Sequence, residues 1–271
     1  MAETVIDGAR ITFEERGKGA PAILLHGWNG SRKEWLFNLK ALAPRFRAIA
    51  PDLPGFGDSE DMRNFSYTLD EAASFLEAFR RRLRLQSFHL VGHSMGGSIA
   101  AHYAAKHPGN VRKLVLISTP TRSSSLALRM RMPGVSQFLS ATYRFRSEAI
   151  LKWTFYHGLH KPEYQDLDFV RANIQTISHT TKTALIESAR LFRKMNLEDD
   201  LRRINRPTLI VFGDKDRTVS TREVALQKKN LPQPYVAIIT GSGHSPNFER
   251  PEIFNQLLVD FLLEEALGVD I

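Results

Sequence analysis

The chain has 271 residues, of which 42% are hydrophobic and 24% are charged, and its formal net charge is +8. This composition is typical of one large globular domain, or of a domain with an insertion, and it excludes a disordered or fibrous protein. Cysteine is absent, which excludes a disulfide framework, a thiolate nucleophile and a cysteine-ligated metal site.

The first segment with a structural signal is TVIDGARITFEE, residues 4–15, in which two β-prone runs flank Asp7-Gly8. Asp-Gly is a strong hairpin signal because both turn positions require a positive φ. We therefore expect an antiparallel hairpin at one edge of a sheet.

Short apolar runs then alternate with helix-like segments along the chain. The runs are AILL (22–25), RAIA (47–50), FHLV (88–91), KLVLI (113–117), TLIVF (208–212) and YVAII (235–239). Because they lack polar alternation, they suit strands that are buried on both faces. The pattern predicts an α/β fold with a mostly parallel central sheet and helices on both of its faces.

Two of the helix-like segments carry clear start or stop signals. Residues 66–85 combine a capping box of Thr68 and Glu71 with an apolar face, and four arginines near their end complement the helix dipole. The second helix is expected to open directly on Ser94 and to close at Pro108-Gly109.

The alternation breaks between the strand ending near Ser118 and the strand starting near Thr208, which almost 90 residues separate. A crossover needs only about a dozen residues. The intervening sequence has helical spacing, including one long segment over 169–195. We predict that residues 120–206 form a helical cap inserted after the sixth strand, and that residues 1–119 and 207–271 form the core.

The stretch GHSMG, residues 92–96, fits the pattern G-x-S-x-G between a predicted strand and a predicted helix. In such a turn the glycines let neighbouring backbones approach, so that the serine hydroxyl stands at the carboxyl edge of the sheet. The N–H groups of the new helix point to where negative charge would form. A helix N-cap is the alternative role for Ser94, but the strand, the helix and Gly97 favour a nucleophile.

A serine hydroxyl needs a base that a third group orients. Among nine histidines, His244 lies in a glycine-flanked loop between the last predicted strand and the last helix, which places it at the same edge. We interpret His89, His102, His107, His157, His160 and His179 as packing or surface residues, and His93 as a residue that packs inside the turn.

The acid is expected to follow another strand at this edge. Asp214 and Asp216 come directly after the run TLIVF. Asp216 is preferred because it lies far enough along the loop to turn back toward His244, while Asp214 is the second choice and is expected to cap the loop.

An oxyanion hole needs backbone donors that are fixed before charge develops. The N–H of Met95 is one by position, and the turn at His26-Gly27 presents the N–H of Trp28 as the other. His26 is either a substrate contact or a residue that hydrogen-bonds its own loop.

Five motifs, HGWNG (26–30), DLPGFGDS (52–59), GHSMGG (92–97), GDKD (213–216) and GSGH (241–244), resemble the α/β-hydrolase fold superfamily in order and spacing, and in particular its serine esterase-like branch. The resemblance covers nearly the whole chain outside the insertion, which corresponds to that family's variable cap. It implies that Ser94, Asp216 and His244 form a catalytic triad and that Trp28 and Met95 form the oxyanion hole. DLPGFGDS would be a structural loop near the site.

The resemblance predicts a serine hydrolase that cleaves small-molecule carboxylic esters through an acyl-enzyme intermediate, with no cofactor and no metal. Family members that open haloalkanes or epoxides use an aspartate in place of Ser94, so both chemistries are disfavoured. Carbon–carbon bond hydrolysis, lactone hydrolysis and perhydrolysis on the same triad stay open. A non-catalytic receptor on this fold is a further alternative, which a burst without turnover would reveal.

Aromatic residues of the insertion are the predicted substrate contacts, namely Phe138, Tyr143, Trp153 and Phe155. Basic residues are interleaved with them, including Arg144, Arg146 and Lys152. One interpretation is a set of amphipathic cap helices with aromatic side chains inward and basic side chains outward. The other is an acyl-binding wall whose basic outer face recruits an anionic partner.

The positive charge is concentrated in this insertion. Residues 120–206 contain 15 Lys and Arg against 8 Asp and Glu, and residues 120–161 contain 7 against the single acid Glu148. A basic surface suits nucleic acid, but the aromatic spacing is helical and no nucleic-acid-binding motif is present. HGW followed by DLPGFG, with a basic cap, is similar to the carboxylesterases that demethylate pimeloyl esters on acyl carrier protein. This similarity implies an anionic carrier protein as a partner.

Location follows from what the sequence lacks. No apolar run approaches the roughly 18 residues of a membrane-spanning helix. The opening MAETVIDGAR has acidic residues where a secretory signal would carry positive charge. We expect a soluble, cytoplasmic protein with no membrane span, and the sequence leaves its oligomeric state open.

Overall fold

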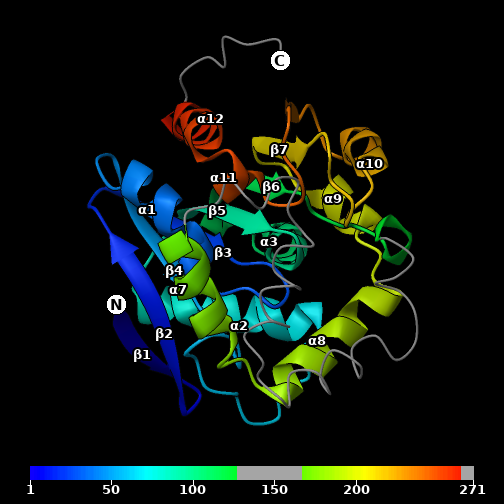
Figure 1. Cartoon of the computed structure of the whole chain (residues 1–271). Helices are drawn as coiled ribbons and strands as arrows, with labels where there is room; N and C mark the ends of the chain where they lie inside the picture. The colour runs from blue at the N-terminus through cyan, green and yellow to red at the C-terminus, as the bar shows by residue number, and fades with distance from the viewer. Residues whose placement is uncertain (127–166, 264–271) are drawn as a thin grey trace.

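A computed structural model gives the fold and describes residues 1–126 and 167–263 (Figure 1). In these residues one sheet contains eight strands in the order β1-β2-β4-β3-β5-β6-β7-β8. The strands are β1 (Ala2–Ile6), β2 (Ala9–Arg16), β3 (Ala20–Leu25), β4 (Phe46–Pro51), β5 (Phe88–His93), β6 (Val111–Ile117), β7 (Thr208–Gly213) and β8 (Tyr235–Ile239). Each predicted apolar run is a strand.

β1 and β2 form the predicted hairpin at one edge of the sheet. Ile6 pairs with Ala9, and the turn residues Asp7 and Gly8 have φ of 47° and 83°. β2 pairs antiparallel with β4, and all the following pairs are parallel. The prediction of a mostly parallel sheet with an antiparallel edge is therefore confirmed.

Helices cover both faces of this sheet. The helices of the described residues are α1 (Leu36–Leu42), α2 (Leu69–Arg82), α3 (Met95–Lys106), α7 (Leu167–Ile177), α8 (Lys182–Lys194), α9 (Glu198–Arg203), α10 (Arg222–Asn230), α11 (Pro246–Glu249) and α12 (Pro251–Leu263), with short 3₁₀ turns η1 (Arg32–Trp35), η2 (Pro108–Asn110) and η3 (Ser123–Ser125). Helices α1 and α12 pack on one face, and α2, α3 and α9 pack on the other.

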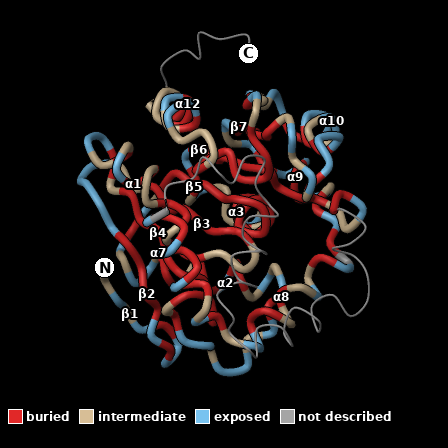
Figure 2. The backbone as a smooth tube through the Cα atoms, in the orientation of Figure 1, coloured by how far each residue is buried: buried red, intermediate tan, exposed pale blue. Residues whose placement is uncertain are grey.

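The inner strands are buried on both faces, as their unbroken apolar runs predict. Every residue of β5 and β7 is buried, while the outer strand β1 alternates between exposed and less exposed residues (Figure 2). Because parallel strands end at one edge, this buried sheet brings the loops that follow β3, β5, β7 and β8 together.

Two helices begin and end as their sequence signals predict. The Thr68 hydroxyl accepts a hydrogen bond from the Glu71 N–H at 3.2 Å, which caps α2. Helix α3 opens directly after Ser94 and ends at Lys106, just before Pro108.

The predicted long segment over 169–195 is instead two helices, α7 and α8. The chain leaves α7 after Ile177, and Thr181 starts α8 by accepting a hydrogen bond from the Ala184 N–H at 3.1 Å. The apolar spacing continues across the break, so the sequence pattern does not indicate it. The Thr181 N-cap determines where the second helix begins.

Helix α7 packs onto the core through an apolar cluster. The Phe169 ring stacks on Phe37 at 4.8 Å between centroids and lies 5.2 Å from the Phe248 ring. Val170, Ile174 and Ile177 complete the buried cluster. This part of the predicted cap is therefore seated on α1 and α11.

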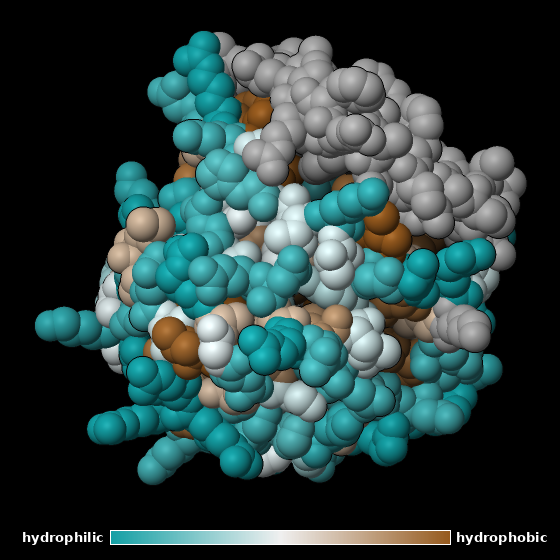
Figure 3. Space-filling view, turned by 90° about the horizontal axis from the view of Figure 1, so that it is seen from below, coloured by the Kyte–Doolittle hydropathy of each residue, from teal (hydrophilic) through white to brown (hydrophobic). Residues whose placement is uncertain are grey.

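The remaining cap predictions fall on residues 127–166, outside the described residues. They include the contacts Phe138, Tyr143, Trp153 and Phe155, so these and the division into core and cap stay predictions. In the described part of the chain, no helix has the length and apolarity to cross a membrane. In the view from below, the surface formed by the described residues is predominantly hydrophilic, with separate apolar areas (Figure 3).

Candidate active site

Ser94 lies in a strained turn between β5 and α3. Its φ of 51° and ψ of −115° are unusual for a residue with a side chain, and its N–H donates to the Ile117 carbonyl at 2.8 Å. A Cβ at Gly92 would overlap the Gly96 carbonyl, and one at Gly96 would overlap the Leu25 carbonyl. The glycines of the motif thus allow the strand and the helix to approach as closely as the turn requires.

His244 and Asp216 meet at the same edge of the sheet. His244 Nδ1 lies 2.9 Å from Asp216 Oδ2, and the Asp216 side chain is fully buried. Asp216 Oδ1 accepts the N–H groups of Thr218 and Val219 at 2.8 and 3.0 Å. Burial raises the pKa of Asp216, but the charge and hydrogen bond of His244, with these N–H groups, outweigh it and lower the pKa below its usual value.

Asp214 points to a different partner. Its Oδ1 accepts the Gly241 N–H at 2.7 Å, at the start of the loop that carries His244. Its carboxylate therefore caps this loop, while Asp216 makes the contact with the imidazole.

The loop around His244 is held from both sides. The two carboxylate oxygens of Glu249 accept the N–H groups of Gly243 and Ser245, each at 2.9 Å. The Lys215 N–H donates to the Ser242 carbonyl at 2.9 Å. Sequence reasoning did not single out Glu249, whose place one helical turn past Ser245 was the available signal.

The turn at His26–Trp28 lies against the serine turn. A Cβ built on Gly27 would lie 3.4 Å from Ser94 Cβ, so the two backbones are neighbours. The indole N–H of Trp28 donates to Ser188 Oγ of α8 at 3.0 Å. The turn beside Ser94 is therefore also in contact with the helices of the predicted cap.

His26 is engaged entirely by its own loops. The side chain is fully buried, its Nε2 accepts the Leu53 N–H at 3.0 Å, and its Nδ1 lies 2.8 Å from the Gly27 carbonyl. Both ring nitrogens are thus occupied by backbone groups. The geometry supports the loop-holding role and leaves no ring nitrogen of His26 free for a substrate.

Four further histidines, His89, His102, His107 and His179, lie away from the contact between His244 and Asp216. Burial lowers the pKa of His89 to about 4, so that its imidazole is neutral. His102 lies between Asp200 and Asp70 at 2.8 and 3.0 Å. His107 packs on Tyr103 with 4.7 Å between ring centroids, and His179 Nδ1 lies 2.6 Å from Asp58 Oδ1.

An apolar pocket adjoins the start of α3. It is lined by Met95 together with residues of α2, α3, α8 and the loop after β4, among them Phe56, Phe75, Ile99 and Leu191. Within the described ranges, no group of three or more His, Asp or Glu side chains could hold a metal ion.

A family model for the alpha/beta hydrolase fold matches residues 21–251, a span that includes the serine turn, both aspartates and His244. The chain belongs to the alpha/beta hydrolase fold family. It is a hydrolase, and the resemblance found in its sequence motifs is confirmed at the level of the fold and the family.

Three relatives illustrate the range of this hydrolase family. The AB hydrolase superfamily protein YisY of Bacillus subtilis is 31% identical over 256 residues, which cover 92% of this chain and 93% of YisY. The pimeloyl-[acyl-carrier protein] methyl ester esterase of Aeromonas hydrophila is 26% identical over 259 residues, which cover 93% of this chain and 99% of that enzyme. The crystal structure of a bromoperoxidase from Bacillus anthracis superposes with a TM-score of 0.83 and 27% identity, over 94% of this chain and 96% of that one.

Proposed function

We propose that the protein hydrolyses carboxylic esters, with Ser94 as nucleophile, His244 as general base and Asp216 as the residue that orients it. The observation that carries the proposal is the buried 2.9 Å contact between Asp216 and His244, at the sheet edge where Ser94 stands in a strained turn. A carboxylate on Nδ1 fixes the tautomer that leaves Nε2 free to accept a proton.

In the first step the Ser94 hydroxyl attacks the ester carbonyl and gives its proton to Nε2 of His244. The negative charge that forms on the carbonyl oxygen is stabilised by the N–H groups of Met95, at the start of α3, and of Trp28. Such donors contribute roughly 3 to 4 kcal/mol each because they are oriented before charge appears. His244 then protonates the departing alkoxide, which leaves as an alcohol, and the acyl group remains on Ser94.

In the second step water attacks the acyl-enzyme. His244 takes a proton from this water and returns it to Ser94 Oγ as the carboxylic acid departs. The apolar pocket beside Met95 favours an ester with an apolar acyl or alcohol portion.

Replacing Ser94 with alanine tests this assignment. We expect kcat for p-nitrophenyl ester hydrolysis to fall on the order of 10⁶-fold, because the nucleophile is lost. Ser98→Ala makes the same change one turn along α3, where the hydroxyl donates to the Pro120 carbonyl at 2.7 Å, and it should retain turnover. Turnover retained by a folded Ser94→Ala variant would refute the assignment.

Methyl esters carried on acyl carrier protein are the second candidate substrate. The Aeromonas relative carries that activity in its name, and residues 120–206 of this chain hold 15 basic against 8 acidic residues. An acidic carrier would be attracted to such a surface. Carbon–carbon, lactone and perhydrolysis activities, and the cytoplasmic location, stay predictions.

Charge reversal distinguishes the carrier-bound substrate from a free one. Replacing Arg144 and Arg146 with glutamate should raise KM for carrier-bound methyl esters, with a steep dependence on salt, and should spare small esters. A matched control reverses Lys18 and Arg45, which are exposed at the opposite, amino edge of the sheet. Equal effects on both substrates would exclude recruitment through the cap.

A further inference from the structure

A buried histidine–carboxylate pair lies beside the site and has no part in the mechanism above. Glu34, in η1, and His93, the last residue of β5, are both buried, with 5% and 4% of their surfaces exposed. Glu34 Oε1 lies 3.3 Å from His93 Nδ1. Burying two ionisable groups is costly, so their placement next to each other calls for a function.

His93 holds the residue proposed as general base. Its Nε2 lies 2.9 Å from the backbone carbonyl of His244, and the centroids of the two rings are 5.0 Å apart. A carbonyl can only accept a hydrogen bond, so Nε2 of His93 carries a proton and donates it. His93 thereby holds the His244 carbonyl, whereas Glu249 holds the N–H groups of the residues before and after His244.

Glu34 holds the turn proposed as oxyanion hole. Its Oε2 accepts the Gly27 N–H at 3.3 Å, one residue before the proposed donor Trp28. Together the two side chains connect the ends of three strands: β3 through Gly27, β5 through His93, and β8 through His244. These are the strand ends that carry the oxyanion turn, the nucleophile and the base.

The carboxylate oxygen of Glu34 that faces His93 favours the protonated form of the imidazole. Burial lowers the pKa of His93, but the charge of Glu34 and its contact with the ring outweigh this and raise it, with smaller contributions from the His244 carbonyl and Asp216. Because both side chains are buried, water screens this interaction only weakly.

The glycines of HGWNG make room for this arrangement. A Cβ at Gly27 would lie 2.9 Å from His93 Nδ1, and one at Gly30 would lie 2.7 Å from Glu34 Oε2. A side chain at either position would collide with the buried pair. The spacing of these glycines thus follows from the pair as well as from the turn itself.

We propose that Glu34 and His93 are positioning residues, which together set the distance between the oxyanion turn and His244. The inference rests on the proposed function, because it assigns roles relative to Ser94 and His244. It predicts that loss of the pair slows the chemical step without weakening substrate binding, since neither side chain lines the apolar pocket.

Two replacements of Glu34 separate hydrogen bonding from bulk. Glu34→Leu removes both contacts, whereas the amide of Glu34→Gln keeps an oxygen for the Gly27 N–H and offers an N–H to a neutral His93. We expect Glu34→Leu to lower kcat for p-nitrophenyl esters about 10- to 100-fold with KM changed less than about threefold, because small misplacements of reacting groups are costly. Glu34→Gln should stay within about fivefold of the unsubstituted protein, because it retains the positioning contacts.

His93→Leu should resemble Glu34→Leu, and His89→Leu is its matched control. His89 is also a buried histidine of β5, but it lies toward the other end of the strand, with its ring against Phe46. We expect His89→Leu to leave kcat unchanged. If His93→Leu does not fold, the two Glu34 variants decide alone, at a temperature where circular dichroism shows both to be folded.

The outcomes separate this inference from the proposed function. If Ser94→Ala is inactive while Glu34→Leu keeps the original kcat, the ester hydrolase stands and the positioning role is refuted. Equal losses in Glu34→Leu and Glu34→Gln, or a rise in KM in place of a fall in kcat, would also refute it. An active Ser94→Ala would overturn the proposed function and, with it, this inference.

Discussion

Two of the regions in which a histidine contacts an aspartate differ in how far the two side chains are buried. At the candidate active site, His244 and Asp216 are 2.9 Å apart with 11% and 0% of their side chains exposed. Where the predicted cap meets the core, His179 and Asp58 are 2.6 Å apart with 48% and 30% exposed. The two contacts have similar lengths, so distance alone does not distinguish their importance.

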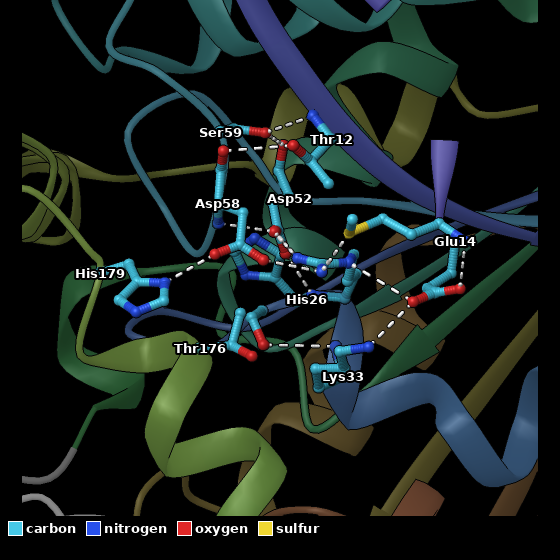
Figure 4. A network of polar contacts seen from close by, with 12 residues as sticks. Thr12, Glu14, His26, Lys33, Asp52, Asp58, Ser59, Thr176 and His179 are labelled. Carbon is cyan, nitrogen blue, oxygen red and sulfur yellow. Dashed lines mark hydrogen bonds and ion pairs between the residues drawn. The ribbon is translucent and has the colours of Figure 1, made fainter. Parts of the chain in front are cut away.

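The second region is an anchor for the helices of the predicted cap (Figure 4). Arg32 is buried and forms an ion pair with the fully buried Asp52, and its Nη2 lies 2.7 Å from Asp58. Asp58 turns its other oxygen to His179, between α7 and α8. The Thr181 N–H adds a bond of 2.8 Å to the Gly55 carbonyl.

Burial decides what each pair contributes. A buried pair whose remaining lone pairs are satisfied by backbone N–H groups, as in Asp216, has one geometry and resists any change of partner. An exposed pair competes with water and contributes little to stability. The candidate site is thus fixed by buried contacts to the backbone. The region that holds the predicted cap combines a buried ion pair, Arg32 with Asp52, and an exposed contact, Asp58 with His179.

Of the two contacts compared, the buried pair is expected to show the larger effect. Asp216→Asn should lower kcat for ester hydrolysis about 10⁴-fold, because an amide no longer selects the tautomer of His244 that accepts a proton. The pKa of Asp216 is held below its usual value, so the carboxylate stays charged at neutral pH. Any contribution of this charge to stability is therefore present above about pH 4 and is lost only as the pH falls through the lowered pKa.

Asp214→Asn provides the matched control for steady-state kinetics. It makes the same chemical change two residues away, and the amide oxygen can still accept the Gly241 N–H. We expect kcat within a few-fold of the original, because the loop cap survives. If the two asparagine variants lose activity equally, the assignment of Asp216 as the orienting acid is wrong, and so is the contrast drawn between the regions.

Much of this architecture could be predicted because its signals are local. Asp7-Gly8 specifies its own turn, and the glycines around Ser94 specify theirs, within a few residues of sequence. Asp216 could be preferred over Asp214 because the length of the loop limits how far each carboxylate reaches. The contact between Asp216 and His244 and the cap at Asp214 agree with that preference.

Other features depend on contacts between residues far apart in the sequence, and no local sequence pattern predicts them. Glu34 meets His93, and Arg32 meets Asp52, only after the sheet has formed. The break between α7 and α8 was missed because the apolar periodicity runs through it. The sequence did not decide the role of His26 because its partner Leu53 follows a different strand, and the two residues meet only in the folded chain.

The smallest effect is expected at the exposed pair. His179→Gln should lower the free energy of unfolding, measured by denaturant titration, by less than about 1 kcal/mol, because nearly half of the His179 side chain is in water. Asp58→Asn should lower the free energy of unfolding by more, since it also removes the carboxylate charge that faces the buried Arg32. If His179→Gln cost several kcal/mol, the outer pair would behave like a buried one. The α7 cluster around Phe169 would then no longer suffice to account for how this part of the chain is held on the core.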